Sequence, residues 1–320
     1  MSLRAFLAGA VAGLLAIAPA AAEPLKTVAT FSILGDLVRE VGGDRVAVET
    51  LVGPGGDAHV FSPAPADARK VAEAKVLFEN GLGFEGWISR LVAASGSSAT
   101  VVVASKGVAA RALEDEEDEH DHGHKDHGKA KDHDHGHAHK GHDHGGIDPH
   151  AWQSVANAKV YVANIRDALI AADPDGRAAY EANAAAYEAK LDGLETEIRD
   201  GWAAVPAERR RVITSHDAFG YYAAAYGVEM IAPQGVSTET EASAKDVARI
   251  IRQIKAEKIP AVFVETISDA RLAQRIAKET GARVGGALYS DSLSPANGPA
   301  ATYLDMMRWN LRQLTATSGG

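Results

Sequence analysis

Short apolar runs alternate with amphipathic stretches over most of the chain, starting at Thr27. The apolar runs have the length of strands, and the stretches between them repeat apolar residues at helical spacing. Alternation of this kind predicts α/β layers with a parallel sheet. In the first half, the predicted strands are 27–34, 46–52, 76–78 and 100–103, and the predicted helices are 35–41, 64–74 and 84–94.

A second alternating series occupies the C-terminal part of the chain. Its clearest helix start is a capping box, in which Ser243 precedes Asp246 by three residues. The sequence therefore predicts two α/β lobes. In the second lobe, the predicted strands are 211–214, 261–264 and 283–287, and the predicted helices are 221–226, 243–257, 270–280 and 299–314.

Between the two series, residues 156–201 are rich in Ala, Glu, Lys, Arg and Tyr at helical spacing, with a break near Asp173-Pro174. This pattern predicts a long helix or helix pair that joins the lobes. The expected fold class is α/β, with two parallel-type sheets flanked by helices and bridged by a long, rigid helix. The expected domains are a signal peptide at 1–22, an N-terminal lobe at 23–155, the connecting helix at 156–204 and a C-terminal lobe at 205–320.

The first residues have the features of a secretory signal peptide. Arg4 is followed by an almost unbroken apolar run from Ala5 to Ala18, and small residues end at Ala22. The run is too short for a comfortable membrane span, so we expect cleavage after Ala22. No later stretch has the length and hydropathy of a membrane span, and the mature protein is expected to be soluble.

The chain contains no cysteine. An exported protein of this length must then fold by burial alone, without disulfides. Thiolate zinc sites, thiol nucleophiles and a lipidated cysteine are also excluded. We therefore expect a freely diffusing periplasmic protein that is not lipid-anchored. The net charge of -10 disfavours nucleic acid and anionic lipid as partners, and it is compatible with attracting cations.

Residues 114–146 consist almost wholly of His, Asp, Glu, Lys and Gly, and this composition predicts a disordered loop. Clustered imidazoles and carboxylates could hold several Zn²⁺ ions, as a second and weaker class of site. The alternative is a solvated acidic linker that is rich in histidine. The loop histidines are His120, His122, His124, His127, His133, His135, His137, His139, His142 and His144.

Of the 13 histidines, only His59, His150 and His216 lie outside this loop. Each lies in a short polar segment that follows a strand-like run or the loop, and such segments line the ligand crevice of open α/β sheets. Taken singly, each has an ordinary alternative: an exposed loop residue, an eleventh member of the tract, or a helix cap. Trp152, close to the second histidine, could shield a site from water.

Three imidazoles and one oxygen donor suit a tetrahedral Zn²⁺ site, because harder, all-oxygen sets favour Mg²⁺, Ca²⁺ or Mn²⁺. The candidate fourth ligand is Asp291, which follows the last predicted strand, although Asp at such a place is often a turn former. A water molecule is the alternative. Glu265 is a similar candidate, and we interpret it as a residue that supports a ligand through a hydrogen bond or ion pair.

These segments resemble the cluster A-I solute-binding proteins of ABC transporters, specifically the zinc-binding ZnuA branch, over essentially the whole mature chain. Seven matches in the same order are more specific than any single motif. The matching stretches are 31–38, 41–46, 51–59, 80–85, 148–152, 215–221 and 288–293.

The resemblance implies a protein that captures Zn²⁺ in a cleft between two lobes and delivers it to the membrane permease of an ABC importer. His59 and His150 would come from the first lobe, and His216 and Asp291 from the second. His216 indicates the zinc branch, since manganese-binding relatives carry a carboxylate there. Some zinc relatives place a glutamate where this chain has Ala58, and others carry a disulfide that this chain cannot form. We expect a monomer.

A rival interpretation is a secreted zinc hydrolase that uses the three histidines and a metal-bound water, with Asp217 or Glu265 as general base. The sequence contains no H-E-x-x-H or G-x-S-x-G motif, and ligands spread over the whole chain suit a clamp better than a protease helix. A structural or adhesive surface protein is disfavoured by the histidine-rich loop and the lack of repeats. We therefore expect a binding protein and not an enzyme.

Overall fold

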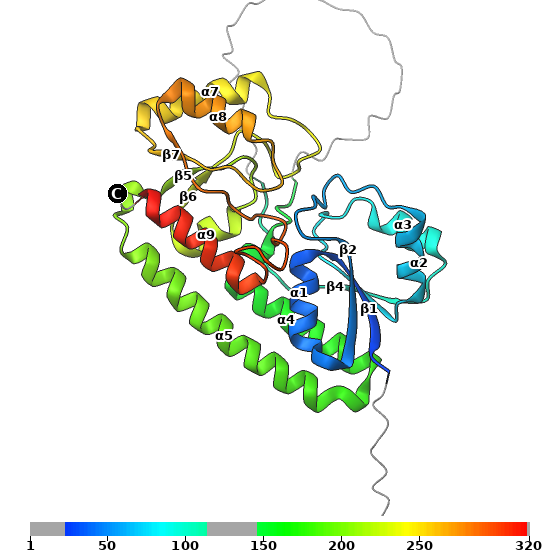
Figure 1. The fold of residues 1–320 in the computed structure, drawn as a ribbon. Helices are drawn as coiled ribbons and strands as arrows, with labels where there is room; N and C mark the ends of the chain where they lie inside the picture. Colours follow the sequence, from blue (N-terminus) through cyan, green and yellow to red (C-terminus); the bar gives the residue numbers. More distant parts are fainter. Residues whose placement is uncertain (1–22, 114–145, 319–320) are drawn as a thin grey trace, which may run out of the picture.

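The computed structural model describes residues 23–113 and 146–318. The predicted signal peptide at 1–22 and the ten histidines of the predicted loop lie outside the described residues. The described part forms two lobes, each built on a parallel sheet, beside a pair of long helices (Figure 1). No helix in this part is long and apolar enough to cross a bilayer.

The first lobe is a four-stranded parallel sheet with the strand order β2-β1-β3-β4. Helices α1 and α4 pack on one face of this sheet, and α2 packs against β1 and α3 on the other. The buried faces of β1 and β3 supply the centre of the core, as their apolar sequences predict. The elements of this lobe are β1 (Leu25–Phe31), α1 (Ser32–Gly42), β2 (Val46–Val52), α2 (Pro65–Glu73), β3 (Val76–Glu79), α3 (Ile88–Ser95) and β4 (Thr100–Val103).

The second lobe repeats this arrangement with shorter strands, in the order β6-β5-β7-β8. Helices α7 and α8 pack together over one face of the sheet. One half of the predicted capping box is present at the start of α7, where the Ser243 hydroxyl accepts a hydrogen bond from Asp246 N. The Asp246 carboxylate accepts from this hydroxyl. The elements are β5 (Arg211–Ile213), α6 (Gly220–Tyr226), β6 (Glu229–Ile231), α7 (Ala244–Glu257), β7 (Ala261–Val262), α8 (Ala270–Thr280) and β8 (Arg283–Val284).

Two antiparallel helices pack side by side, α4 (Val155–Ala172) and α5 (Arg177–Ala203). Helix α4 covers the first sheet, and the longer α5 contacts α1 of the first lobe and α6 of the second. The two helices are separated at Asp173-Pro174, and Asp173 accepts hydrogen bonds from Arg45 and Tyr180 there. The buried side of α5 is a stripe at intervals of three and four residues, and it packs against α1 and α9. The stripe consists of Tyr180, Ala184, Tyr187, Leu191, Leu194, Ile198 and Trp202.

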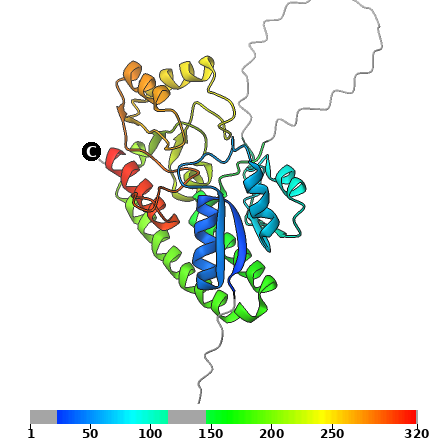
Figure 2. The same ribbon diagram turned by 45° about the vertical axis from the view of Figure 1, so that its right-hand side comes forward.

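The last helix, α9 (Tyr303–Ser318), lies beside α5 in both ribbon views (Figures 1 and 2). Its first residue is bound to the first lobe, because Tyr303 N donates to Asp36 Oδ2 of α1 at 2.8 Å. The predicted fold class, two parallel-sheet lobes bridged by a long helix, is confirmed. The strand β6 was not predicted, and α9 begins four residues later than the pattern indicated.

The contact between α1 and α9 makes the stability of the fold depend on pH. Burial raises the pKa of Asp36 from 3.8 to about 6, against the lowering effect of the Tyr303 N–H; Glu40 and Asp305 raise this pKa and Arg39 lowers it. The folded state therefore binds a proton between about pH 4 and 6 that the unfolded state has released. The contribution of Asp36 to stability decreases as the pH rises through this window.

We expect Asp36→Asn to be more stable than the wild type above pH 7, by up to roughly 3 kcal/mol, which corresponds to a shift of about two pKa units. The neutral amide oxygen still accepts the hydrogen bond from Tyr303 N. Urea unfolding of both proteins at pH 4.0, 5.5 and 8.0 measures the effect. A difference in stability that does not change with pH would contradict the assignment.

Candidate metal centre

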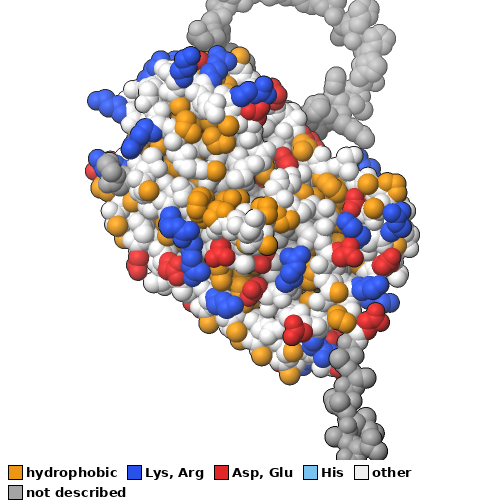
Figure 3. All heavy atoms as spheres, in the orientation of Figure 1, with side chains coloured by type: hydrophobic (Ala, Val, Ile, Leu, Met, Phe, Trp, Pro, Cys, Tyr) orange, Lys and Arg blue, Asp and Glu red, His pale blue; other side chains and the backbone are white. Residues whose placement is uncertain are grey.

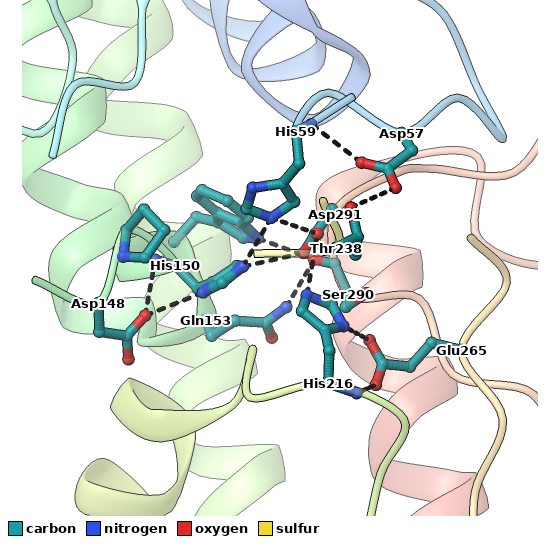
Figure 4. Close-up of polar contacts among 12 residues, drawn as sticks. Asp57, His59, Asp148, His150, Gln153, His216, Thr238, Glu265, Ser290 and Asp291 are labelled. Carbon is teal, nitrogen blue, oxygen red and sulfur yellow. Dashed lines mark hydrogen bonds and ion pairs between the residues drawn. The ribbon is translucent and has the colours of Figure 1, made fainter. Parts of the chain in front are cut away.

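His59 lies in the loop that follows β2. The Asp57 side chain accepts a hydrogen bond from His59 N at 2.9 Å and turns the backbone so that the imidazole points into the cleft (Figure 4). The Phe84 ring packs against this imidazole, with 4.6 Å between the ring centroids. His59 is 7% exposed, so it is not an ordinary surface histidine.

His150 lies just before the helical turn that leads into α4. Both its backbone N and its Nδ1 are 2.9 Å from Asp148 Oδ1. Asn80 of the first lobe donates to Pro149 O and holds the approach to the histidine. Trp152 packs at 5.3 Å between ring centroids, as a shield against water. The hydrogen bond from Nδ1 to a carboxylate leaves the Nε2 lone pair free to bind a metal.

His216 lies beyond the end of β5, where Glu265 reaches it from the end of β7. One carboxylate oxygen of Glu265 accepts hydrogen bonds from Ser215 N at 2.8 Å and His216 N at 2.9 Å. The other is 2.6 Å from His216 Nδ1. Glu265 therefore supports the histidine through its Nδ1, and Nε2 faces the cleft.

Asp291, which follows β8, completes a buried cluster of four residues whose candidate ligand atoms all lie within 4.8 Å of one another. Asp291 Oδ2 is 3.2 Å from Nε2 of both His59 and His216, and Asp291 Oδ1 is 3.5 Å from His150 Nε2. The Nε2 atoms of His59 and His150 are 3.3 Å apart. The four side chains converge on one point in Figure 4.

Charge at the cluster favours a cation. Burial opposes protonation of His216, but Glu265 and Asp291 outweigh it and hold the pKa of His216 well above its ordinary value. Burial likewise opposes protonation of His150, whereas Asp291 and Asp148 raise its pKa to about 9. Burial would raise the pKa of Asp291, yet the two imidazoles keep it well below the ordinary value. Buried carboxylates of this kind require cationic partners.

The ligand atoms are also poorly satisfied by hydrogen bonds. Within the described residues, both carboxylate oxygens of Asp291 and Nε2 of His216 are buried without a hydrogen-bond partner. Buried polar atoms are rarely left in this condition, and a bound ion is one of the explanations. A tetrahedral Zn²⁺ with bonds of 2.0–2.1 Å places its ligand atoms about 3.3 Å apart. The distances from the Asp291 oxygens to the three Nε2 atoms, 3.2–3.5 Å, and the 3.3 Å between Nε2 of His59 and His150 are close to this spacing, and all four ligand atoms lie within 4.8 Å of one another.

The structure brings together the four residues that the sequence singled out, His59, His150, His216 and Asp291. Glu265 contacts His216 Nδ1, in the supporting position inferred from the sequence. The face shown in Figure 3 carries many Lys, Arg, Asp and Glu side chains but shows no imidazole, in agreement with the burial of the described histidines.

Sequence reasoning missed two carboxylates that orient the histidines, Asp57 and Asp148. Each lies two residues before a candidate ligand, and each accepts a hydrogen bond from the backbone N–H of that histidine. The signal was therefore present as the pattern Asp-x-His at both places. An aspartate at this spacing bonds the backbone two residues on, as in an Asx-turn.

Comparison with known proteins shows the family to which this chain belongs. Residues 27–317 match the family described as "Zinc-uptake complex component A periplasmic" (ZnuA). The chain is 34% identical over 289 residues to the manganese-binding lipoprotein MntA of Halalkalibacterium halodurans, covering 90% of this chain and 87% of that protein. It is 32% identical over 286 residues to the iron-binding protein YfeA of Yersinia pestis, covering 89% and 84%.

The fold is similar to that of the periplasmic zinc-binding protein TroA from Treponema pallidum. The TM-score is 0.80 at 27% identity, and the match covers 93% of this chain and all of that chain (100%). A manganese-bound periplasmic metal-binding protein from Candidatus Liberibacter asiaticus matches with a TM-score of 0.77 at 28% identity, over 92% of this chain and 100% of that chain. The names of these relatives include manganese, iron and zinc.

Proposed function

Because this chain belongs to the ZnuA family of periplasmic zinc-uptake components, we propose that it captures Zn²⁺ between its lobes and delivers it to a membrane permease. The protein is a metal-binding, substrate-binding component of an ABC importer and not an enzyme. Its cargo is a divalent metal. Zinc as the preferred metal, the four ligands and the site of delivery are our proposals.

The observation that carries the choice of zinc is the donor set. Three imidazole nitrogens and one carboxylate oxygen can be chosen within 4.8 Å of one another, and the carboxylate oxygens lie 3.2–3.5 Å from the three Nε2 atoms, close to the spacing in a tetrahedral Zn²⁺ site. Imidazole is a borderline donor that suits zinc, whereas Mn²⁺ prefers oxygen. Relatives named for manganese or iron show that the family is not confined to one metal. We therefore propose that His216, as the third nitrogen donor, is the main source of zinc preference.

The remaining features of the proposal concern location and organisation. We propose a periplasmic monomer whose domains have the limits predicted above, with removal of residues 1–22. Several relatives are named lipoproteins, whereas this sequence has no cysteine that could carry a lipid. Partition of the mature protein between detergent and aqueous phases tests this part. We also propose that the histidine-rich tract gathers zinc for the cleft.

Two carboxylates prepare the ligands for binding. Asp148 and Glu265 each lie within hydrogen-bond distance of an Nδ1 atom, so that Nε2 of His150 and His216 presents its lone pair to the metal. Such partners fix the imidazole orientation before the metal arrives, and removing them costs about 10–100-fold in metal affinity in other sites. The site is thus ordered in advance.

One consequence concerns Gly220, at the start of α6. A Cβ atom there would lie 2.5 Å from Asp148 Oδ2 and 3.2 Å from Arg111 Nε, so Gly220→Ala must displace the carboxylate that holds His150. We expect zinc affinity to fall by about tenfold. Competition with a chromophoric chelator measures it. The matched control is Gly235→Ala, whose Cβ would meet nothing within 4 Å. Equal affinities in the two variants would show that the Asp148 contact is unimportant.

The main test is a calorimetric zinc titration with analysis of bound metal. It compares the mature protein, a variant without residues 114–146, and that variant with His59, His150 and His216 replaced by alanine. We expect one tight site that survives removal of the tract and disappears with the three histidines. Parallel titrations with Mn²⁺ and Fe²⁺ test the choice of metal. If tight binding disappears with the tract alone, the protein is a metal buffer and the cleft proposal is wrong.

A further inference from the structure

The residues around Asp291 are attached to the first lobe, although they follow β8 of the second. Ser290 O accepts two hydrogen bonds, from Trp152 Nε1 at 2.9 Å and from Gln153 Nε2 at 2.7 Å. Both donors lie on the short helical turn Ala151–Gln153, which directly follows His150 and precedes α4 (Figure 4). The backbone next to Asp291 is therefore clamped to the same turn that carries a ligand of the first lobe.

A second clamp lies on the other side of Asp291. The Ser292 and Ser32 hydroxyls are 3.2 Å apart, and Leu293 N donates to Ser32 Oγ at 2.9 Å. Gly55 N, in the loop that carries His59, lies 2.7 Å from Ser292 Oγ and 3.1 Å from Leu293 O. All three residues from 290 to 292 are buried. Asp291 is thus held from both sides by the first lobe.

The attachment continues further along the chain. Tyr303 donates through its backbone N to Asp36 on α1, at 2.8 Å, and through its hydroxyl to Trp152 O, at 2.7 Å. The stretch from Ser290 to the start of α9 is therefore tied to the first lobe at both of its ends. The chain thus passes from the second lobe to the first between β8 and Ser290, and Asp291 lies on the side of the first lobe.

His216 is attached differently. Its backbone N donates to Glu265 after β7, and its carbonyl accepts from the Thr214 hydroxyl after β5. Ile213 and Val262 of these strands pack on a core shared with α7 and α8. The neighbouring Val212 and Ala261 face the main core, so the second sheet lies between the two cores. Trp202 of α5 donates to Tyr222 on α6, which keeps any displacement of this lobe small.

Resting on the proposed function, we infer that Ser32, Trp152 and Gln153 are positioning residues for Asp291, so that the ligands divide three to one between the moving parts. His59, His150 and Asp291 stay together with the first lobe. His216 is the ligand that moves away from them, and Glu265, which supports it, moves with it. A small shift of the second sheet then opens the coordination shell by one donor. Release follows from a three-coordinate ion that is exposed to a competing ligand. The division by chain order, two ligands from each lobe, does not describe the movement.

A disulfide between the two facing serines tests this division. The chain has no cysteine, so Ser32→Cys with Ser292→Cys introduces the only thiols, at positions whose oxygens are already 3.2 Å apart. The full-length mature variant is loaded with one equivalent of Zn²⁺, oxidised with diamide, and mixed with excess EDTA. We expect release rates of the oxidised and reduced forms to agree within about twofold, because the bond joins parts that do not separate.

A slower release of zinc from the oxidised form would contradict the inference. If Asp291 moves away with the second lobe, the disulfide traps the metal, and release slows by about tenfold or more until the bond is reduced. That outcome would overturn the inference. Loss of zinc binding in every form, the wild type included, would instead contradict the proposed function. The two failures are therefore distinguishable.

A second pair of variants tests the clamp without a disulfide. Trp152→Phe with Gln153→Leu removes both donors to Ser290 O, and Asn164→Leu removes an amide that bonds two carbonyls of the first lobe far from the site. With one equivalent of Co²⁺ as probe, we expect the visible absorption band to change and metal release to accelerate in the first variant alone. Identical spectra and rates in both variants and the wild type would refute the positioning role.

Discussion

Replacing Asp291 with asparagine is expected to reduce zinc affinity by at least about a hundredfold, above the range seen when only a supporting residue is lost. The side chain keeps its size but loses the carboxylate that faces the three imidazoles of the cluster. Both of its oxygens lack hydrogen-bond partners within the described residues, and their neighbours at 3.2–3.5 Å are imidazole Nε2 atoms. An amide is a weak zinc ligand, and it presents an N–H₂ group toward one of these nitrogens.

Chelator competition on the variant measures this loss, with Asp36→Asn as the matched control. Asp36 is also a buried aspartate, but it binds the start of α9 and not the cleft. We expect its substitution to leave zinc affinity unchanged while altering the dependence of stability on pH. If Asp291→Asn binds zinc as tightly as the control does, a water molecule or another group completes the coordination shell.

The second large effect is expected at Glu265, where structural and metal-binding roles can be separated. Glu265→Leu leaves the buried N–H groups of Ser215 and His216 without an acceptor. Each unpaired group costs about 1–3 kcal/mol, so the metal-free protein should lose roughly 3 kcal/mol in its free energy of unfolding. Zinc affinity should fall by about 10–100-fold at the same time, because His216 Nδ1 loses its carboxylate.

Glu265→Gln is the matched variant. Its amide oxygen can still accept from both backbone N–H groups, so stability should change little. Its N–H₂ group then faces His216 Nδ1 and favours the tautomer that carries its proton on Nε2, the atom that must bind the metal. We therefore expect zinc affinity to fall nearly as far as in Glu265→Leu. Urea unfolding and zinc titration of both variants separate the effects, and tight binding by the glutamine variant would show that the tautomer is unimportant.

Much of the fold could be predicted from local patterns. The predicted strand 46–52 and helix 270–280 coincide with β2 (Val46–Val52) and α8 (Ala270–Thr280). In α8 the start is marked by a cap, because the Asp269 side chain accepts a hydrogen bond from Arg271 N. The predicted helix 84–94 begins four residues too early, because Glu85 accepts hydrogen bonds from Asn80 N and the Thr30 hydroxyl and holds this stretch in a turn.

The observed strands differ from the predicted ones in two places, and in both the difference depends on packing against distant parts of the chain. The strand β6 (Glu229–Ile231) has three residues and alternates too little to stand out, yet it pairs with β5 along its whole length. The apolar stretch 27–34 was predicted as one strand, whereas α1 begins at Ser32 within it. Apolar residues alone do not distinguish a buried strand from the first turn of a buried helix.

The sequence by itself determined which residues could form the metal centre. Only three histidines lie outside the low-complexity tract, and each follows a strand-like run or the tract itself, where parallel sheets place ligands. It also supplied two acidic candidates, Asp291 as the fourth ligand and Glu265 as a residue that supports a ligand. The limits of the domains, the signal peptide and the histidine-rich loop stay predictions, since the described residues do not test them.

Only the tertiary structure decided where these residues lie relative to one another and which lobe holds each of them. It placed Asp291 at the ligand atoms and Glu265 behind His216, although both follow strands of the same sheet. It also joined the residues after Asp291 to the first lobe, through hydrogen bonds of Ser292 and Leu293 with Ser32, far away in the sequence. Local patterns record which residues become strands, helices and turns, because these depend on neighbours in the chain. Which strand ends meet, and which body holds a segment after it crosses between lobes, depends on long-range packing.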